Sequence, residues 1–358
     1  MKYSFILLFI IISITICGCI ARNKSNPAGN IELTPVSMID NKTPADTMEN
    51  TPVSISGEKT PASKKNYTFT KYSIPAAKKI DPSLKAEVDE AIADMMNMKD
   101  VQKSFDGRQK LDKLCEKYNG NVPLFAYLLE HSEPQVAYKA MWGVGFGDKM
   151  KPAEKFQVLI CAVKHPSDYA RSNVFFNLSS QANTQQEKET LKKLAREALD
   201  DPSPHVRTNA VFVLGQVRDT ESIDKIKEML KTDPAQQVTS SAVEALDKLG
   251  AYNKEEYLDI LKNGTPYVKC SVISVMSNRK EKDIITLLAG MLDDRTETFF
   301  SEKCIDETPM SYNALRGTLQ EMAVIGLETI TGQKFKGQDE NDLEGTVRQW
   351  KEWCKKNK

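Results

Sequence analysis

Histidine is scarce in this chain of 358 residues, which holds only three. The sequence also lacks CxxC, HExxH and GxSxG, the spacings typical of thiol redox sites, zinc peptidases and serine hydrolases. A zinc site needs three or four ligands close together, whereas successive histidines lie 34 and 40 residues apart. The sequence therefore predicts a non-catalytic protein without catalytic, cofactor-binding or metal-binding residues.

A surplus of positive charge is also missing. Lys and Arg together number 49, and so do Asp and Glu. Residues 1–80 carry ten of the basic and five of the acidic residues, which leaves 39 basic against 44 acidic residues in the remainder. Nucleic-acid affinity rests largely on a basic face that displaces counterions from phosphates. The composition therefore argues against DNA or RNA as a partner.

An apolar run, Phe5–Ile16, follows a charged start at the N-terminus. The run is shorter than the roughly 20 residues of a membrane-spanning helix and is typical of a signal peptide. It ends in Ile16-Cys17-Gly18-Cys19, with a small residue before the second cysteine. This ending resembles the bacterial lipobox, and the resemblance implies that residues 1–18 are removed and that Cys19 is diacylated. A cleaved soluble protein and an uncleaved anchor are the alternatives.

Residues 19–78 are rich in Thr, Pro, Ser, Asn and Lys and follow no helical or strand period. Such a segment cannot bury enough apolar surface to fold, so we expect a disordered tether with a reach of about 40 Å. More than one acyl chain on Cys19 would hold the chain stably on a membrane. Ile20 stands where an Asp favours inner-membrane retention in enteric bacteria, so we expect the outer membrane of a bacterial cell envelope.

The same pattern occurs twice within residues 201–250. The second copy repeats the apolar positions of the first after 32 residues: Val206, Ala210 and Leu214, then Val238, Ala242 and Leu246. Apolar residues at i, i+4 and i+8 lie on one face of an α-helix. Matching units start at Val136, Ala170 and Val268. Five units in tandem within residues 131–292 predict an array of stacked helix pairs.

This pattern resembles the HEAT repeat, in the short form of PBS-lyase HEAT-like proteins. The resemblance implies an all-α, right-handed α-α superhelix of armadillo type, in which an Asp in the turn before a repeat and an Arg six residues later help to join neighbouring repeats. Asp201 with Arg207 matches both positions, and Asp233 matches the first. His131 and His165 depart from the pattern, so we expect this structural ladder only near the middle of the array.

The helical part of the chain divides into three predicted segments. They are an N-terminal helical cap at 79–130, the five repeats at 131–292, and an insertion with C-terminal capping helices at 293–358. Asp81-Pro82-Ser83 predicts a helix start, and Thr331-Gly332 predicts a helix end. Trp350 and Trp353 lie within one turn of the predicted last helix, which favours a cap over an exposed ligand patch.

Two local features have more than one interpretation. The glycines of residues 143–147 could suggest a phosphate-binding loop, but no strand precedes them, so we predict a turn at the end of a repeat's first helix. Cys304 and Cys354 lie in less regular surroundings than the other cysteines of the body. A disulfide between them is left open.

The function predicted from these patterns is a protein-binding scaffold on a membrane, because helical solenoids offer long surfaces to protein segments. A bilin-lyase-like or other cofactor-handling enzyme is one alternative. An envelope assembly factor that binds glycan or peptidoglycan is another. The predicted second helices become more acidic along the array, and Glu255, Glu256 and Asp259 are the candidate residues for binding a basic segment of a partner.

Overall fold

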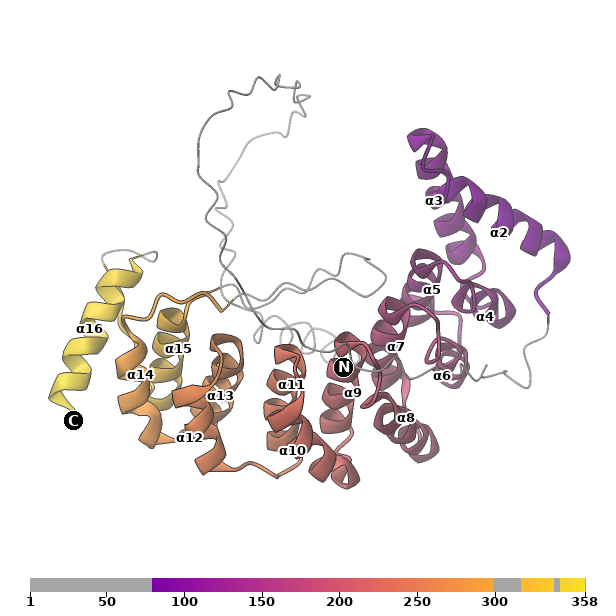
Figure 1. Cartoon of the computed structure of the whole chain (residues 1–358). Coiled ribbons are helices and arrows are strands. Elements are labelled where there is room, and N and C mark those ends of the chain that lie inside the picture. Colours follow the sequence, from indigo (N-terminus) through magenta and orange to yellow (C-terminus); the bar gives the residue numbers. More distant parts are fainter. Residues whose placement is uncertain (1–78, 299–316, 338–341, 358) are drawn as a thin grey trace, which may run out of the picture. The chain divides into compact units, whose positions relative to one another are not determined.

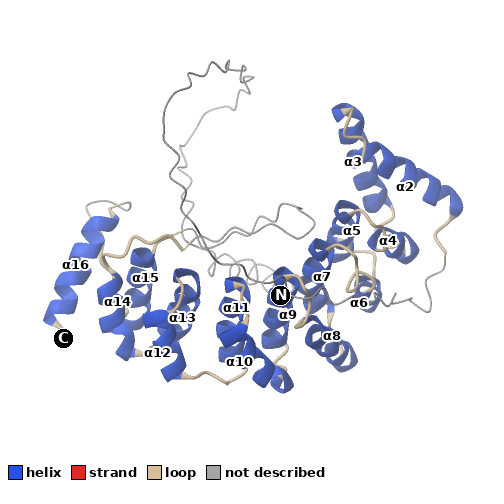
Figure 2. Cartoon of the chain, in the orientation of Figure 1, coloured by secondary structure: helices blue, strands red, loops and turns tan. Residues whose placement is uncertain are grey.

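The computed structural model of the chain describes residues 79–298, 317–337 and 342–357. All of these residues belong to the larger of two compact units, Thr68–Lys358. This described part contains fifteen α-helices, two short 3-10 helices and one isolated β-bridge (Figure 2). The predicted all-α class is confirmed.

Three helices precede the repeats: α2 (Pro82–Met95), α3 (Val101–Lys117) and α4 (Val122–Leu129). Each has an N-cap side chain, from Asp81, Asp100 or Asn121, that accepts a hydrogen bond from a backbone N–H of the first turn. Such caps satisfy donors that a helix start leaves unpaired. The helix start predicted at residues 81–83 is confirmed.

Five helix pairs follow within the segment predicted to hold the repeats (Figure 1). Their bounds are α5 (Pro134–Phe146) with α6 (Pro152–Ile160), α7 (Asp168–Gln181) with α8 (Gln185–Ala198), α9 (Pro204–Gln216) with α10 (Ile223–Thr232), α11 (Gln236–Lys248) with α12 (Lys254–Asn263), and α13 (Pro266–Asn278) with α14 (Ile285–Met291). The 3-10 helices η1 (Thr220–Ser222) and η2 (Lys282–Ile284) lead into α10 and α14.

The first helices of the pairs form one continuous layer. Helix α5 packs on α7, α7 on α9, α9 on α11, α11 on α13, and α13 on α15 (Leu319–Thr331). The second helices α8, α10, α12 and α14 each pack mainly against the first helix that follows them in the chain. Equivalent positions of neighbouring first helices therefore lie side by side.

The core of this layer is built from the repeated apolar positions. All residues at the i, i+4 and i+8 positions of the five first helices are buried, including Ala210 and Ala242, which have no exposed surface. Helices α9 and α11 come especially close: a Cβ atom at Gly215 would lie 2.9 Å from the Cα atom of Ala245. Small residues thus permit close contact between the repeats.

The turn predicted at residues 143–147 is wrong in its position. Gly143 and Gly145 lie inside α5, which ends only at the C-cap residue Gly147. A Cβ atom at Gly143 would lie 2.5 Å from Cε1 of Phe125 in α4. The glycine therefore serves close packing of α4 on α5, and the backbone stays helical because neighbouring residues still bury an apolar face.

The last two helices close the described array. Helix α15 begins with a capping box between Thr318 and Glu321 and ends at Gly332, whose φ of 73° is the left-handed conformation that glycine adopts readily. The predicted helix end at residues 331–332 is confirmed. In α16 (Leu343–Lys356), Trp350 is fully buried and packs edge-on against Phe335 at a centroid distance of 4.8 Å.

Backbone hydrogen bonds join the described residues on either side of 299–316. The backbone N–H of Thr298 donates to the carbonyl of Gly317 at 2.9 Å, and that of Leu319 donates to Thr296 at 3.0 Å. Residues 299–316, including Cys304, lie outside the described residues. Cys354 is buried in α16.

Candidate protein-binding surface

The turns that enter α5, α7, α9 and α11 share one polar contact. In each, a side chain accepts a hydrogen bond from the backbone N–H two residues later, and these acceptors are His131 Nδ1 (3.2 Å), His165 Nδ1 (3.0 Å), Asp201 Oδ1 (2.9 Å) and Asp233 Oδ1 (3.0 Å). An imidazole nitrogen and a carboxylate oxygen can both fix a turn in this way. Histidine therefore replaces aspartate at this position without loss of the turn.

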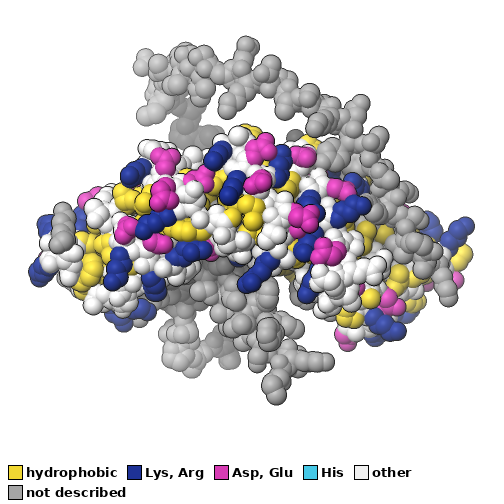
Figure 3. All heavy atoms as spheres, turned by 90° about the horizontal axis from the view of Figure 1, so that it is seen from below, with side chains coloured by type: hydrophobic (Ala, Val, Ile, Leu, Met, Phe, Trp, Pro, Cys, Tyr) yellow, Lys and Arg dark blue, Asp and Glu magenta, His cyan; other side chains and the backbone are white. Residues whose placement is uncertain are grey.

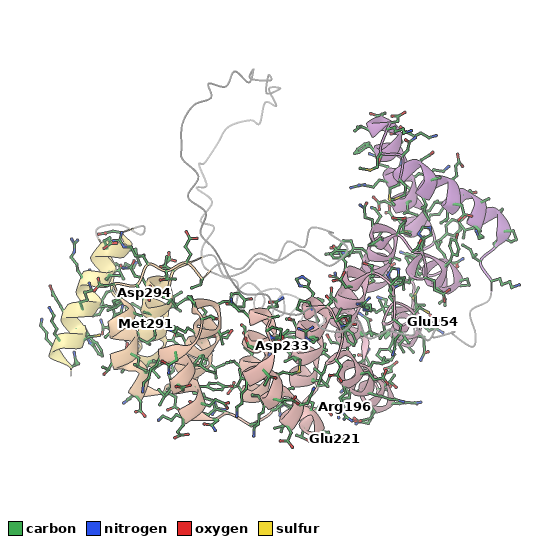
Figure 4. The ribbon with its side chains drawn as sticks, in the orientation of Figure 1. Glu154, Arg196, Glu221, Asp233, Met291 and Asp294 are labelled. Atoms are coloured by element: carbon green, nitrogen blue, oxygen red, sulfur yellow. The ribbon has the colours of Figure 1, made fainter. Side chains whose placement is uncertain are left out.

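Arg207 joins two of these turns. Its Nη1 donates to the carbonyls of Asp201 and Pro202 at 2.9 and 3.1 Å, while Nε and Nη2 donate to the two carboxylate oxygens of Asp233 at 2.8 and 2.9 Å. Asp233 lies between α9 and α11 (Figure 4). The residues expected to form the ladder, Asp201, Arg207 and Asp233, are thus in one network, in which the carboxylate bound by each arginine belongs to the next repeat.

Arg171 forms a second rung that the sequence analysis missed. Its Nε and Nη2 both donate to the carboxylate of Asp201 at 2.9 Å, and its Nη1 donates to the carbonyls of His165 and Pro166. Arg171 and Asp201 are 5% and 3% exposed. The alignment of Arg171 with Arg207 could have predicted this contact, because the carboxylate partner of each arginine lies in the following repeat.

The ladder extends further towards the N-terminus than expected. Nε2 of His165 lies 2.7 Å from the carbonyl of His131. Burial lowers the pKa of His165, so the neutral ring donates through Nε2 and accepts through Nδ1. In the other direction, Thr239 bonds to Gln236 of its own helix and joins no other repeat. The expectation of a ladder only near the middle is therefore wrong on the N-terminal side, whereas on the C-terminal side the ladder ends as expected.

The three acidic candidates for partner binding lie on α12, but not all are available. Glu255 is exposed, Glu256 pairs with Lys231 of α10 at 3.4 Å, and Asp259 accepts a hydrogen bond from Asn263 at 2.7 Å. Two of the three side chains are therefore already engaged within the chain.

Other charges of the second helices are also paired across repeats. Lys254 pairs with Glu281 at 3.1 Å, and Arg196 of α8 pairs with Glu221 at 2.6 Å (Figure 4). Arg196 also binds Asp219 and holds the pKa of that carboxyl below its usual value, although burial opposes this shift. Figure 3, which views the molecule from below, shows basic and acidic side chains interspersed on that face. This face therefore carries charges of both signs and is not an acidic surface.

One position of the first helices carries large apolar side chains over part of the layer. It lies two residues before the last buried residue of the repeated pattern, and in α5, α7, α9, α11, α13 and α15 it holds Trp142, Phe176, Phe212, Glu244, Ser274 and Ile325. Trp142 is 49% exposed, Phe176 54% and Ile325 38%, and the other three are partly buried. We call Trp142, Phe176 and Phe212, on the adjacent helices α5, α7 and α9, the aromatic row.

Further side chains border the aromatic row. Tyr138 of α5 packs against Trp142 at a centroid distance of 5.9 Å and against Tyr169 of α7 at 5.1 Å. At the other end, Nζ of Lys248 lies 5.0 Å from the ring centroid of Phe212. At the equivalent position of α11, the pKa of Glu244 is raised by burial. The aromatic row thus ends where polar groups begin on α11.

A pocket of about 460 Å³ adjoins the first member of the aromatic row. It lies between α3 and α5 and is lined by Asp112, Glu116, Tyr138, Lys139 and Trp142, among others. Lys139 is paired with Asp112, whereas Glu116 forms no ion pair with the described residues. The pocket therefore combines an indole wall with a net negative charge.

The described ranges contain neither a candidate metal cluster nor a candidate membrane-spanning helix. Among them, no three His, Cys, Asp or Glu side chains gather in a way that could hold a metal ion. No helix of residues 79–298, 317–337 or 342–357 has both the length and the apolar character needed to cross a bilayer. Cys19 and the predicted signal peptide lie outside these ranges.

Comparison with known proteins gives one family match. Residues 157–247 match the family model of HEAT repeats. This segment of the chain is therefore similar to HEAT repeats. It spans α7 to α11, the helices that carry both arginine rungs of the ladder. No curated protein matches the sequence.

Two solved structures of low sequence identity are similar to the chain. YibA of Escherichia coli is 14% identical, with a TM-score of 0.46, and the similarity covers 77% of this chain and 98% of that one. The complex of CpcE and CpcF of phycocyanin lyase from Nostoc sp. PCC7120 gives 15% identity and a TM-score of 0.36, over 80% of this chain and 98% of that one.

Proposed function

We propose that this HEAT-repeat protein is a non-catalytic scaffold that binds a protein partner through the exposed face of its first helices, while a lipid at Cys19 anchors it to a bacterial envelope membrane. The observation that carries the binding role is the aromatic row, three large side chains at one equivalent position of successive first helices. Exposed apolar side chains that line up over several elements are typical of protein-interaction sites.

The partner should be found by crosslinking. The full chain, carrying a photoreactive group at the exposed residue Gln216, one helical turn after Phe212 in α9, is crosslinked in intact bacterial cells, and the captured protein is identified by mass spectrometry. We expect one protein to be captured more strongly from Gln216 than from a control chain labelled at Glu352 of α16, an exposed position remote in sequence from the row. Equal capture from both labelled positions would contradict a specific binding face.

The acidic residues of α12 provide a second, separable test. Reversal of Glu255, Glu256 and Asp259 to Lys should weaken capture most at low ionic strength if these charges steer a basic partner. Capture that is unchanged at every salt concentration would exclude them from the binding surface. Reversal of Glu352 is the control for a general change in charge.

The lipid anchor rests on the lipobox-like ending of the predicted signal peptide. We expect Cys19→Ala to abolish incorporation of a labelled fatty acid and to release the protein from the membrane fraction, since two acyl chains hold a protein stably where one binds reversibly. Label that persists on the variant would refute lipidation at this residue. The binding role would stand even then.

A further inference from the structure

We infer that the aromatic row and the adjoining pocket bind a proline-rich partner segment in the polyproline II conformation, with an apolar side chain at every third residue and a Lys or Arg at the end that enters the pocket. This inference rests on the proposed scaffold function and names the chemistry of the partner. It follows from the exposure of the row, the spacing of its helices and the charge of the pocket.

The exposure of Phe176, the central member of the aromatic row, is not a consequence of core packing. Phe175 and Phe176 are adjacent in α7, yet Phe175 is fully buried and Phe176 is 54% exposed. Phe175 alone therefore fills the core at this point of α7. Trp142 and Phe176, about half exposed on the adjacent helices α5 and α7, together with the partly buried Phe212, supply large, rigid contact areas of the kind that dominate binding energy in interfaces.

The spacing of the row fits one backbone conformation. Packed helices lie about 8–10 Å apart, so equivalent side chains on α5, α7 and α9 repeat at about that interval. A polyproline II helix has three residues per turn and rises about 3.1 Å per residue, so every third side chain lies on the same face about 9 Å further on. A β-strand alternates faces every residue and cannot present every third side chain to one surface.

The charge of the pocket indicates that one end of the segment is basic. Asp112 is already paired with Lys139, which leaves Glu116 as the net charge beside the indole of Trp142. A carboxylate next to an aromatic face attracts a Lys or Arg side chain through both the ion pair and the ring. Because Trp142 also begins the aromatic row, the basic residue and the first apolar residue belong to one continuous segment.

The inference is tested with synthetic peptides of about ten residues, the length that spans three helices and the pocket at about 3.1 Å per residue. The peptides are proline-rich, carry leucine at every second or every third position, and have Arg or Glu at one end. Binding to the full chain in detergent micelles is measured by fluorescence anisotropy. We expect the tightest binding from the peptide with period three and an N- or C-terminal Arg.

Variants assign the binding to the surface. Phe176→Ala and Glu116→Lys should each weaken this peptide at least about tenfold, as expected for a central aromatic contact and for a reversed charge. The matched control is Phe105→Ala on α3, because Phe105 is also 54% exposed but lies outside the row. Circular dichroism of each variant excludes unfolding, and both phenylalanines are exposed enough to be removed without opening the core.

Several outcomes would overturn the inference. The first is equal binding of the peptides with leucine at every second and at every third position. The second is tighter binding of the peptides that end in Glu than of those that end in Arg. The third is binding of the peptide to Phe176→Ala with the affinity of the wild type. The scaffold function is judged separately by crosslinking in cells. If the partner is still captured by Phe176→Ala but is lost on reversal of Glu255, Glu256 and Asp259, the scaffold function stands and the aromatic row is not its binding site.

Discussion

Removal of the Asp201 carboxylate should be among the most damaging single changes in the repeats. This carboxylate accepts the hydrogen bonds that Nε and Nη2 of Arg171 donate and also that of the backbone N–H of Ser203, each at 2.9 Å. Asp201→Ala removes all three hydrogen bonds at once. It leaves the guanidinium of Arg171, which is 5% exposed, buried beside an apolar methyl group.

The magnitude follows from the burial of the pair. Removing one partner of a buried ion pair costs about 3–5 kcal/mol, because the remaining charge stays desolvated. Loss of the contact that fixes the turn adds about 1 kcal/mol. We therefore expect Asp201→Ala to lower the free energy of unfolding by about 4–6 kcal/mol. Asp201→Asn should cost less, because its amide oxygen still accepts the backbone N–H.

The assay is urea denaturation followed by circular dichroism. The control is Asp247→Ala, which breaks the ion pair between Arg279 and Asp247, whose side chains are 38% and 30% exposed. Such a surface pair contributes only about 0–1 kcal/mol. An unfolding midpoint of Asp201→Ala equal to that of wild type, or to that of Asp247→Ala, would refute the view that the buried ladder holds neighbouring repeats together.

Three further predictions concern single side chains. The pKa of His165 is lowered in the folded chain, so its neutral form stabilises the fold fully above about pH 6.5 and less as the pH falls below that value. His165→Gln should therefore make the unfolding midpoint less dependent on pH between about pH 8 and 5. Equal slopes for the variant and the wild type would contradict this. Gly215→Val should cost about 1–3 kcal/mol in thermal unfolding because α9 meets Ala245 there, whereas Gly290→Ala, which meets nothing within 4 Å, should have little effect. Burial raises the pKa of Cys115 to about 12, so iodoacetamide at about pH 8 should modify it only after denaturation; rapid labelling of the native chain would show that the thiol is accessible.

The local sequence was sufficient for the helices and for their buried faces. Val206, Ala210 and Leu214 lie on one face of α9 because their spacing matches the helical period, and this holds whatever packs against them. The caps at Asp81 and Gly332 were equally predictable, since they depend on residues within one turn. Repetition of the pattern then required that the helices stack, because a single pair cannot bury its apolar face alone.

Contacts between repeats were decided only by the tertiary structure. Arg171 finds its carboxylate 30 residues away at Asp201, and Gly143 leaves room for Phe125 of another helix. The aromatic row likewise exists only because stacking places residues 142, 176 and 212 on neighbouring helices. Helical periodicity determines the direction of each side chain, but which distant residue it faces depends on how closely the helices pack, and that is a property of the assembled layer.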